Sequence, residues 1–174
     1  MTRPETCKKR LIVGPGVLAS LIAKCRDVLP DQTYGVMAGP EPGFCSAYYL
    51  FQTNLRDKRT RIRDKFVSYG SVYRNPNRGF WVDPAEQLAL LEKLEHDGLQ
   101  MTGFFHTHRI LDARPTAIDQ DLHFHRNVPM IILSITGSGN TEVRAYQHQE
   151  DRWKPIEIVE MDSETGLTKA ACMR

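Results

Sequence analysis

Two histidines and an aspartate stand at a spacing that can build a metal centre. His106 and His108 are one residue apart, and Thr116 and Asp119 follow after a connection of seven residues. On an extended strand the side chains alternate between faces, so His106 and His108 point to the same side and can chelate one ion. Asp119 can then supply an oxygen ligand. Two imidazoles and one carboxylate, with one coordination position left for water, form a catalytic zinc arrangement.

The elements around these residues must bring them together. The apolar run 101–105 predicts a strand that leads directly into His106. The run 116–125 predicts a helix, whose first turn carries Asp119. A strand followed by a short loop and a helix therefore folds the carboxylate back onto the two imidazoles. Zinc held in this way lowers the pKa of its bound water to about 7 and polarises a carbonyl group.

The remaining chain mixes strands and helices without a regular strand–helix–strand repeat, which favours an α+β domain. The best-marked helix begins after Asp83, a good N-cap, and presents an apolar face of Leu88, Leu91 and Leu94. The basic run 54–63 is expected to be a solvated loop or hairpin tip. Further elements are expected as a helix at 17–29 and strands at 34–38, 45–52, 66–69, 130–136, 142–147 and, as an edge strand, 156–159.

Composition indicates one compact domain. The chain has 174 residues, of which 41% are hydrophobic and 25% charged. We expect residues 1–160 to form the domain and 161–174 a polar tail. The net charge of +2 gives no support for nucleic-acid binding, and neither a membrane helix nor a signal peptide is recognisable, so a cytoplasmic location is expected. The four cysteines form no CxxC pair and are interpreted as free thiols rather than a structural zinc site or a disulfide: Cys7, Cys25, Cys45 and Cys172.

The histidine and aspartate spacing resembles that of the JAMM (MPN+) zinc metalloprotease family. That family carries HxH-x7-S-xx-D and a glutamate on an earlier strand. The resemblance covers roughly residues 11–147 and includes the runs 30–37 (PDQTYGVM), 80–84 (FWVDP) and 102–105 (TGFF), and Asn54. It implies the family's α+β fold, a mixed and largely antiparallel sheet flanked by helices. It also implies a role for each matched residue, with His106, His108 and Asp119 as zinc ligands and the Thr116 hydroxyl helping to bind the oxyanion.

Three positions depart from the family pattern. Arg109 follows the second histidine, where the family usually has proline, and Thr116 replaces serine but keeps the hydroxyl. Gln32 stands where the family has the glutamate that takes a proton from zinc-bound water, and an amide has no basic carboxylate for that role. Neither Asp31, which faces the other side of the strand, nor Glu41, beyond a turn, is expected to replace it.

Two explanations of Gln32 are open at this point. One is a zinc-binding domain whose catalysis is naturally weakened or lost. The other is a Glu→Gln replacement introduced to trap a substrate, which the retention of the zinc ligands and of the hydroxyl at Thr116 favours. Under both explanations, the residue at position 32 decides whether the site catalyses hydrolysis.

The resemblance implies cleavage after the C-terminal glycine of a ubiquitin-like or sulfur-carrier protein, whose extended tail pairs with a strand near the site. A short stand-alone domain is more similar to the bacterial members of the family than to the eukaryotic subunits, and bacterial members occur in sulfur-carrier pathways and in conjugation systems of phage defence. One alternative is a zinc-bound module that binds such a tail or a protein partner without turnover. Another is a hydrolase of small amides, which predicts an enclosed pocket rather than an open groove.

A second pair of histidines follows the first. His123 and His125 are again one residue apart, and some eukaryotic members of the family use a similar pair for a structural zinc ion. If the run 116–125 is helical throughout, the two side chains diverge and cannot easily share one ion. We therefore interpret His123 and His125 as surface histidines, with a second zinc site as the alternative.

Overall fold

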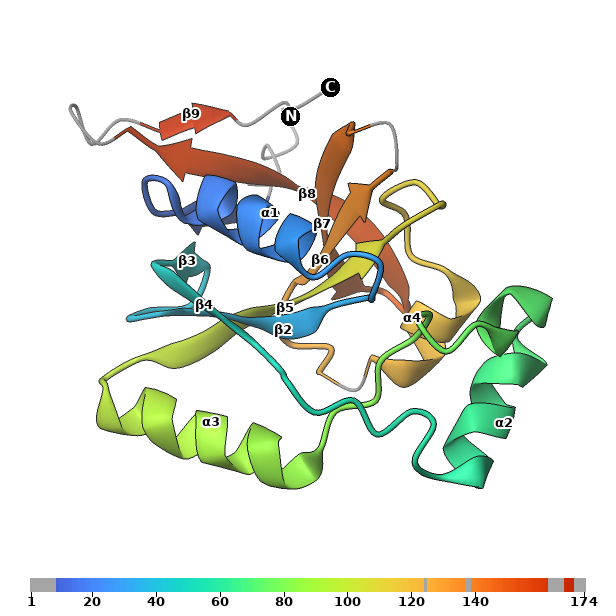
Figure 1. The fold of residues 1–174 in the computed structure, drawn as a ribbon. Helices are drawn as coiled ribbons and strands as arrows, with labels where there is room; N and C mark the ends of the chain where they lie inside the picture. Colours follow the sequence, from blue (N-terminus) through green and yellow to red (C-terminus); the bar gives the residue numbers. More distant parts are fainter. Residues whose placement is uncertain (1–8, 124, 137–138, 163–167, 171–174) are drawn as a thin grey trace.

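The computed structural model describes residues 9–123, 125–136, 139–162 and 168–170. Its strands form one mixed sheet in the order β3-β1-β8-β7-β6-β5-β2-β4, with β9 paired to β8 (Figure 1). Most neighbouring strands are antiparallel, whereas β1 runs parallel to β3 and β8, and β5 parallel to β6. The predicted α+β class with a mixed, largely antiparallel sheet is therefore confirmed.

The strands are β1 (Arg10–Val13), β2 (Tyr34–Gly39), β3 (Phe44–Cys45), β4 (Ala47–Leu50), β5 (Gln100–His108), β6 (Met130–Ile135), β7 (Thr141–Gln149), β8 (Arg152–Met161) and β9 (Thr168–Ala170). The α-helices are α1 (Val17–Asp27), α2 (Thr60–Ser68), α3 (Pro84–His96) and α4 (Ala117–Leu122), and a 3-10 turn η1 (Ser71–Arg74) follows α2. Cys25 and Cys45 are buried free thiols, as predicted, and Cys7 and Cys172 lie outside the described residues.

Helices α1 and α3 cover opposite faces of the sheet (Figure 1). Buried residues of α1 pack in one apolar cluster with Phe105 of β5, and Leu94 of α3 packs in another with Phe104. Because side chains alternate along a strand, Phe105 faces α1 whereas Phe104 and, further along, His106 and His108 face the opposite side. The two histidines are thus placed on the face that α3 and α4 flank.

Helix α3 forms as its sequence predicts, although its apolar face differs. Asp83 caps it by accepting a hydrogen bond from the Ala85 N–H at 3.0 Å. Leu94 is 1% exposed, but Leu88 is 58% exposed and Leu91 is exposed as well, so the predicted face is wrong for those two. The partly buried Leu90 packs with Leu94 in its place. Apolar residues lie on all sides of α3, and the sheet contacts only one of these sides. The spacing of the leucines therefore does not predict which side is buried.

Residues 55–79, which we call the cap segment, differ most from the sequence prediction. The expected loop 54–63 is correct for 54–59 and wrong for 60–63, and the expected strand 66–69 is wrong, since helix α2 occupies 60–68. Arg56 is 1% exposed, donates to the backbone carbonyl of Tyr73, pairs with Asp57, and lies 5.4 Å from the centre of the Phe66 ring. The contacts with Phe66 and Tyr73 join residues that are well separated in sequence. The basic, polar character of the run favours a loop and gives no sign of these contacts.

Asn54 and Gly79 close the cap segment. The Asn54 carboxamide donates to the Gly79 carbonyl at 3.1 Å and accepts from the backbone N–H groups of Arg56 and Trp81. Gly79 has φ +89°, and a Cβ atom there would lie 2.3 Å from the Phe66 ring, so only glycine fits. The ends of the cap segment are thereby fixed beside β2.

At the C-terminal side, β8 lies between β1 and β7, so the prediction of an edge strand at 156–159 is wrong. Its parallel pairing with β1 joins opposite ends of the chain, which a local pattern does not reveal. Residues 168–170 of the predicted tail form β9 against β8.

Candidate metal centre

Strand β5 presents His106 and His108 on one face, as predicted. Both side chains are buried, with residue exposures of 4% and 6%. Thr107, between them, faces the other way, and its hydroxyl accepts a hydrogen bond from the Thr33 N–H at 2.9 Å. The Tyr34 ring stacks on His106 with centroids 6.1 Å apart. Neighbouring strands thus hold both imidazoles in place.

Helix α4 brings Asp119 to the histidines. Thr116 is its N-cap, and a capping box links Thr116 and Asp119 in both directions. The Thr116 N–H and hydroxyl donate to Asp119 Oδ2 at 2.8 and 2.7 Å. These two donors orient the carboxylate toward the imidazoles. The predicted helix 116–125 is correct at its start, but it ends at Leu122.

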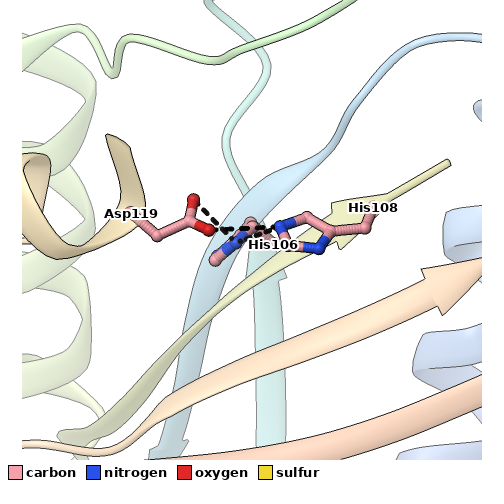
Figure 2. A group of neighbouring side chains, drawn as sticks. All are labelled: His106, His108 and Asp119. Atoms are coloured by element: carbon pink, nitrogen blue, oxygen red, sulfur yellow. Dashed lines mark hydrogen bonds and ion pairs between the residues drawn. The ribbon is translucent and has the colours of Figure 1, made fainter. Parts of the chain in front are cut away.

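The three side chains converge as a metal site requires (Figure 2). The Nε2 atoms of His106 and His108 lie 3.1 Å apart, and they are 3.1 and 3.2 Å from Asp119 Oδ1 and Oδ2, respectively. Zinc–ligand bonds of about 2.0–2.1 Å in tetrahedral geometry separate the ligand atoms by about 3.3 Å. The separation of the two imidazole nitrogens falls within roughly 0.2 Å of that value, and each nitrogen lies close to one oxygen of the carboxylate. His106, His108 and Asp119 can therefore hold a metal ion.

Hydrogen bonding and charge favour this ligand set. The Nδ1 atom of His108 lies 2.8 Å from the Asp112 carbonyl, to which it can donate, leaving Nε2 as the ligand atom. Burial acts to raise the pKa of Asp119, but the charges and hydrogen bonds of His106 and His108 outweigh it and hold that pKa well below its usual range. Burial lowers the pKa of His108, yet Asp119 and the Asp112 carbonyl leave it raised overall. A metal ion must therefore displace a proton from His108 as pH falls.

Comparison with known proteins agrees with this arrangement. A family model described as prokaryotic homologs of the JAB domain matches residues 15–160. The chain belongs to this family. Its fold is similar to the solution structure of protein DSY2949 from Desulfitobacterium hafniense, at 22% identity and TM-score 0.67 over 87% of this chain and 93% of that one. It is also similar to a protein from Salinibacter ruber, at 20% identity and TM-score 0.59 over 90% and 95% of the two chains.

Two further comparisons are negative. Among curated proteins, none matches this JAB-family chain. Within the residues that the structure describes, no helix combines the length and the apolar character needed to cross a bilayer.

Gln32 of this JAB domain lies just before β2 and is fixed by the cap segment. Its backbone N–H donates to the Asn77 carbonyl at 3.2 Å, and its side-chain Oε1 accepts from the Gly79 N–H at 2.6 Å. A backbone N–H can only donate, so this contact identifies Oε1 and leaves the amide nitrogen, Nε2, on the other side. That nitrogen can donate hydrogen bonds but cannot take up a proton.

Gln32 and the three metal-binding residues line one cavity of about 230 Å³. Apolar and aromatic residues from β2, the cap segment, the residues that follow it, β5 and α4 form much of its wall, including Tyr34, Phe66, Phe80, Trp81, Phe104 and Ile118. Among the described residues, Asp119 is the single carboxylate in the lining, and neither Asp31 nor Glu41 reaches it. The lining therefore offers no carboxylate beyond a metal ligand.

Thr116 and His123 both lie close to the three residues that can hold a metal ion. The Thr116 hydroxyl donates to Asp119, so its part in binding an oxyanion stays a prediction. His123 is 6% exposed, and its ring contacts Phe104 and Trp153, so the interpretation as a surface histidine is wrong for it. Burial, more than any other cause, lowers the pKa of His123 to about 4.

His125, in contrast, is exposed, and its Nε2 lies 3.3 Å from the Gln87 amide nitrogen. Neither His123 nor His125 belongs to a metal-binding group of three side chains within the described part of the chain. No sequence signal pointed to the burial of His123, because Trp153 reaches it from the distant strand β8.

Proposed function

We propose that this chain is a zinc-bound JAB module that binds the C-terminal glycine tail of a ubiquitin-like or sulfur-carrier protein. Its site is of the isopeptidase type, which cleaves the amide bond after that glycine, but Gln32 leaves it without the carboxylate that would carry the proton. The natural setting we propose is a bacterial conjugation pathway, such as phage defence, or a sulfur-carrier pathway in the cytoplasm.

The ligand set supports a hydrolytic ancestry for the site. His106, His108 and Asp119 would hold the ion, which when bound activates water and polarises a carbonyl oxygen. His108 is oriented by the Asp112 carbonyl, and Asp119 by the two donors of Thr116. Such orientation of ligands by neighbouring groups is typical of metal sites that must keep an open position.

Gln32 is the observation that carries the proposal. Hydrolysis of an amide needs a group that accepts a proton from water and delivers it to the leaving nitrogen. Gln32 cannot do so, and Asp119 is bound to both histidines and Thr116. With no other carboxylate in the described lining, the chain as it stands is suited to binding a carbonyl group rather than to cleaving the bond beside it.

The experiment is a comparison of this chain with Gln32→Glu on a ubiquitin-like protein fused through its C-terminal glycine to a reporter. General acid–base catalysis contributes roughly 10²–10⁴-fold, so we expect Gln32→Glu to cleave at least 100-fold faster. The double variant Gln32→Glu/His108→Ala and a chelator should both abolish that gain. A zinc titration of every variant verifies loading.

Two results would contradict the proposal. If the unaltered chain cleaves as fast as Gln32→Glu, the site is a working isopeptidase and Gln32 does not limit it. If zinc binds, yet the chain binds no tail and neither version cleaves one, the tail is not the ligand. Small amides would then be the substrates to test, since they require only the cavity.

A further inference from the structure

The cavity at the metal centre contains unpaired positive charge. Besides the histidines, its charged lining residues are Arg78, from the cap segment, and Arg109 and Asp119. Among the described residues neither arginine forms a salt bridge, and the Nε atom of Arg109 is buried without a hydrogen-bond partner. Two arginines of the cavity lining therefore have no carboxylate partner within the described part of the chain.

Gln32 adds to this imbalance. A divalent ion at the site exceeds the single negative charge of Asp119 by one. A glutamate at position 32 would cancel that excess, whereas the glutamine leaves it in place. Because the Gly79 N–H holds Oε1, the unpaired end of the Gln32 side chain is the Nε2 amide, a hydrogen-bond donor. Donors and positive charges together suit an anion.

The cap segment extends the same charge to the surface. Residues 55–79 contain eight Arg and Lys residues against two Asp, while the whole chain has a net charge of only +2. Six of the eight are exposed, namely Lys58, Arg59, Arg61, Arg63, Lys65 and Arg74. A basic surface beside a cavity raises the local concentration of anionic ligands. The cap segment also supplies Arg78 to the cavity itself.

We propose that this cavity selects a free carboxylate end over an amide-linked one, with Gln32 Nε2, Arg78 and Arg109 as its recognition groups. The inference rests on the proposed function and specifies its ligand as the tail after release rather than the conjugated tail. A glutamate at position 32 would repel a carboxylate and tolerate a neutral amide. The glutamine reverses that preference and makes the module a receptor for the processed end.

The test is calorimetric binding of two peptides by the zinc-loaded chain. Both end in Gly-Gly, one with a free carboxylate and one with a carboxamide. We expect the free carboxylate to bind at least tenfold tighter. Gln32→Glu should lower the affinity for the carboxylate peptide at least tenfold and change the affinity for the carboxamide peptide less than twofold. The matched control is Gln87→Glu, which adds the same charge at another glutamine of the cavity lining and should keep the preference.

Arg78→Gln and Arg109→Gln should each lower the affinity for the carboxylate peptide about fivefold, with little effect on the affinity for the carboxamide peptide. Equal affinity for the two peptides, or a preference that survives Gln32→Glu, would overturn the inference. If neither peptide binds, the proposed function fails, and acetate and inorganic phosphate then test the anion site alone. Acetate binding that Gln32→Glu weakens would support that site. Phosphate binding without acetate binding, or no anion binding, would refute the assignment of a carboxylate ligand.

Discussion

Replacing Thr116 by valine tests whether its hydroxyl serves the metal ligand. The hydroxyl donates to Asp119 Oδ2 at 2.7 Å, and it accepts only a long bond of 3.4 Å from the Asp119 N–H. Valine keeps the shape of the side chain and removes the donor. A hydrogen bond to a charged group contributes about 1.5–3 kcal/mol, so we expect the free energy of unfolding of the metal-free protein to fall by roughly 2 kcal/mol.

The larger consequence concerns the metal. Loss of a group that orients a ligand typically lowers metal affinity about 10- to 100-fold. The Thr116 N–H still donates to Asp119 Oδ2 in the variant, so we expect the lower half of that range. Competition with a chromophoric chelator measures the zinc dissociation constant, and Thr116→Ser, which keeps the hydroxyl, should lie within twofold of the parent chain.

One result separates this role from the role in oxyanion binding. If Thr116 acts only on the oxyanion, valine will leave zinc affinity unchanged and reduce only the turnover of a Gln32→Glu chain. Equal zinc affinity of the threonine and valine forms would therefore refute the reasoning from the hydrogen bond. Weaker zinc binding in the valine form, with normal folding by circular dichroism, would support it.

Three other predictions concern stability. Free zinc at 100 times its dissociation constant should raise the free energy of unfolding by about 2.7 kcal/mol, measured by thermal unfolding, and His108→Ala should remove that gain while His125→Ala keeps it. His123, with its pKa lowered to about 4, contributes stability that is complete above pH 6.5 and lost as pH falls to about 4. Urea unfolding of the metal-free chain should show that loss as about 3 kcal/mol, and an equal loss in His123→Phe would contradict it. Arg56→Ala should destabilise the cap segment by about 2–4 kcal/mol, seen as faster amide exchange over residues 60–74, because it leaves the Tyr73 carbonyl unpaired.

The metal ligands could be predicted from the sequence because their geometry is local. Strand alternation places His106 and His108 on one face whatever the rest of the fold does. The capping box then turns Asp119 back toward them within a few residues. What the sequence could not supply is the separation of the three ligand atoms, which depends on the loop between β5 and α4.

The structure of the cap segment could not be predicted from its sequence. Helix α2 buries a single residue, Phe66, and six of its nine residues are Thr, Ser, Arg, Lys or Asp, so its polar sequence favours a loop although Ile62 and Phe66 stand at helical spacing. Its position depends on Arg56, a residue type that is rarely buried, and on contacts with Tyr73 and Gly79. The same limit applies to His123, which is buried by Trp153 from another part of the sheet. Long-range packing of polar side chains decides each of these cases.

Two departures from the family pattern change the site in the same direction. Gln32 stands in the cavity lining where the family has a negative charge, and Arg109, another lining residue, brings a positive charge where the family usually has proline. A site that had simply lost its proton carrier would need only the first change. An added guanidinium without a carboxylate partner instead raises the free energy of the ligand-free cavity. The reason is that apolar walls do not compensate an unpaired charge. Both changes are explained together if the ligand itself supplies the missing negative charge, as a terminal carboxylate does.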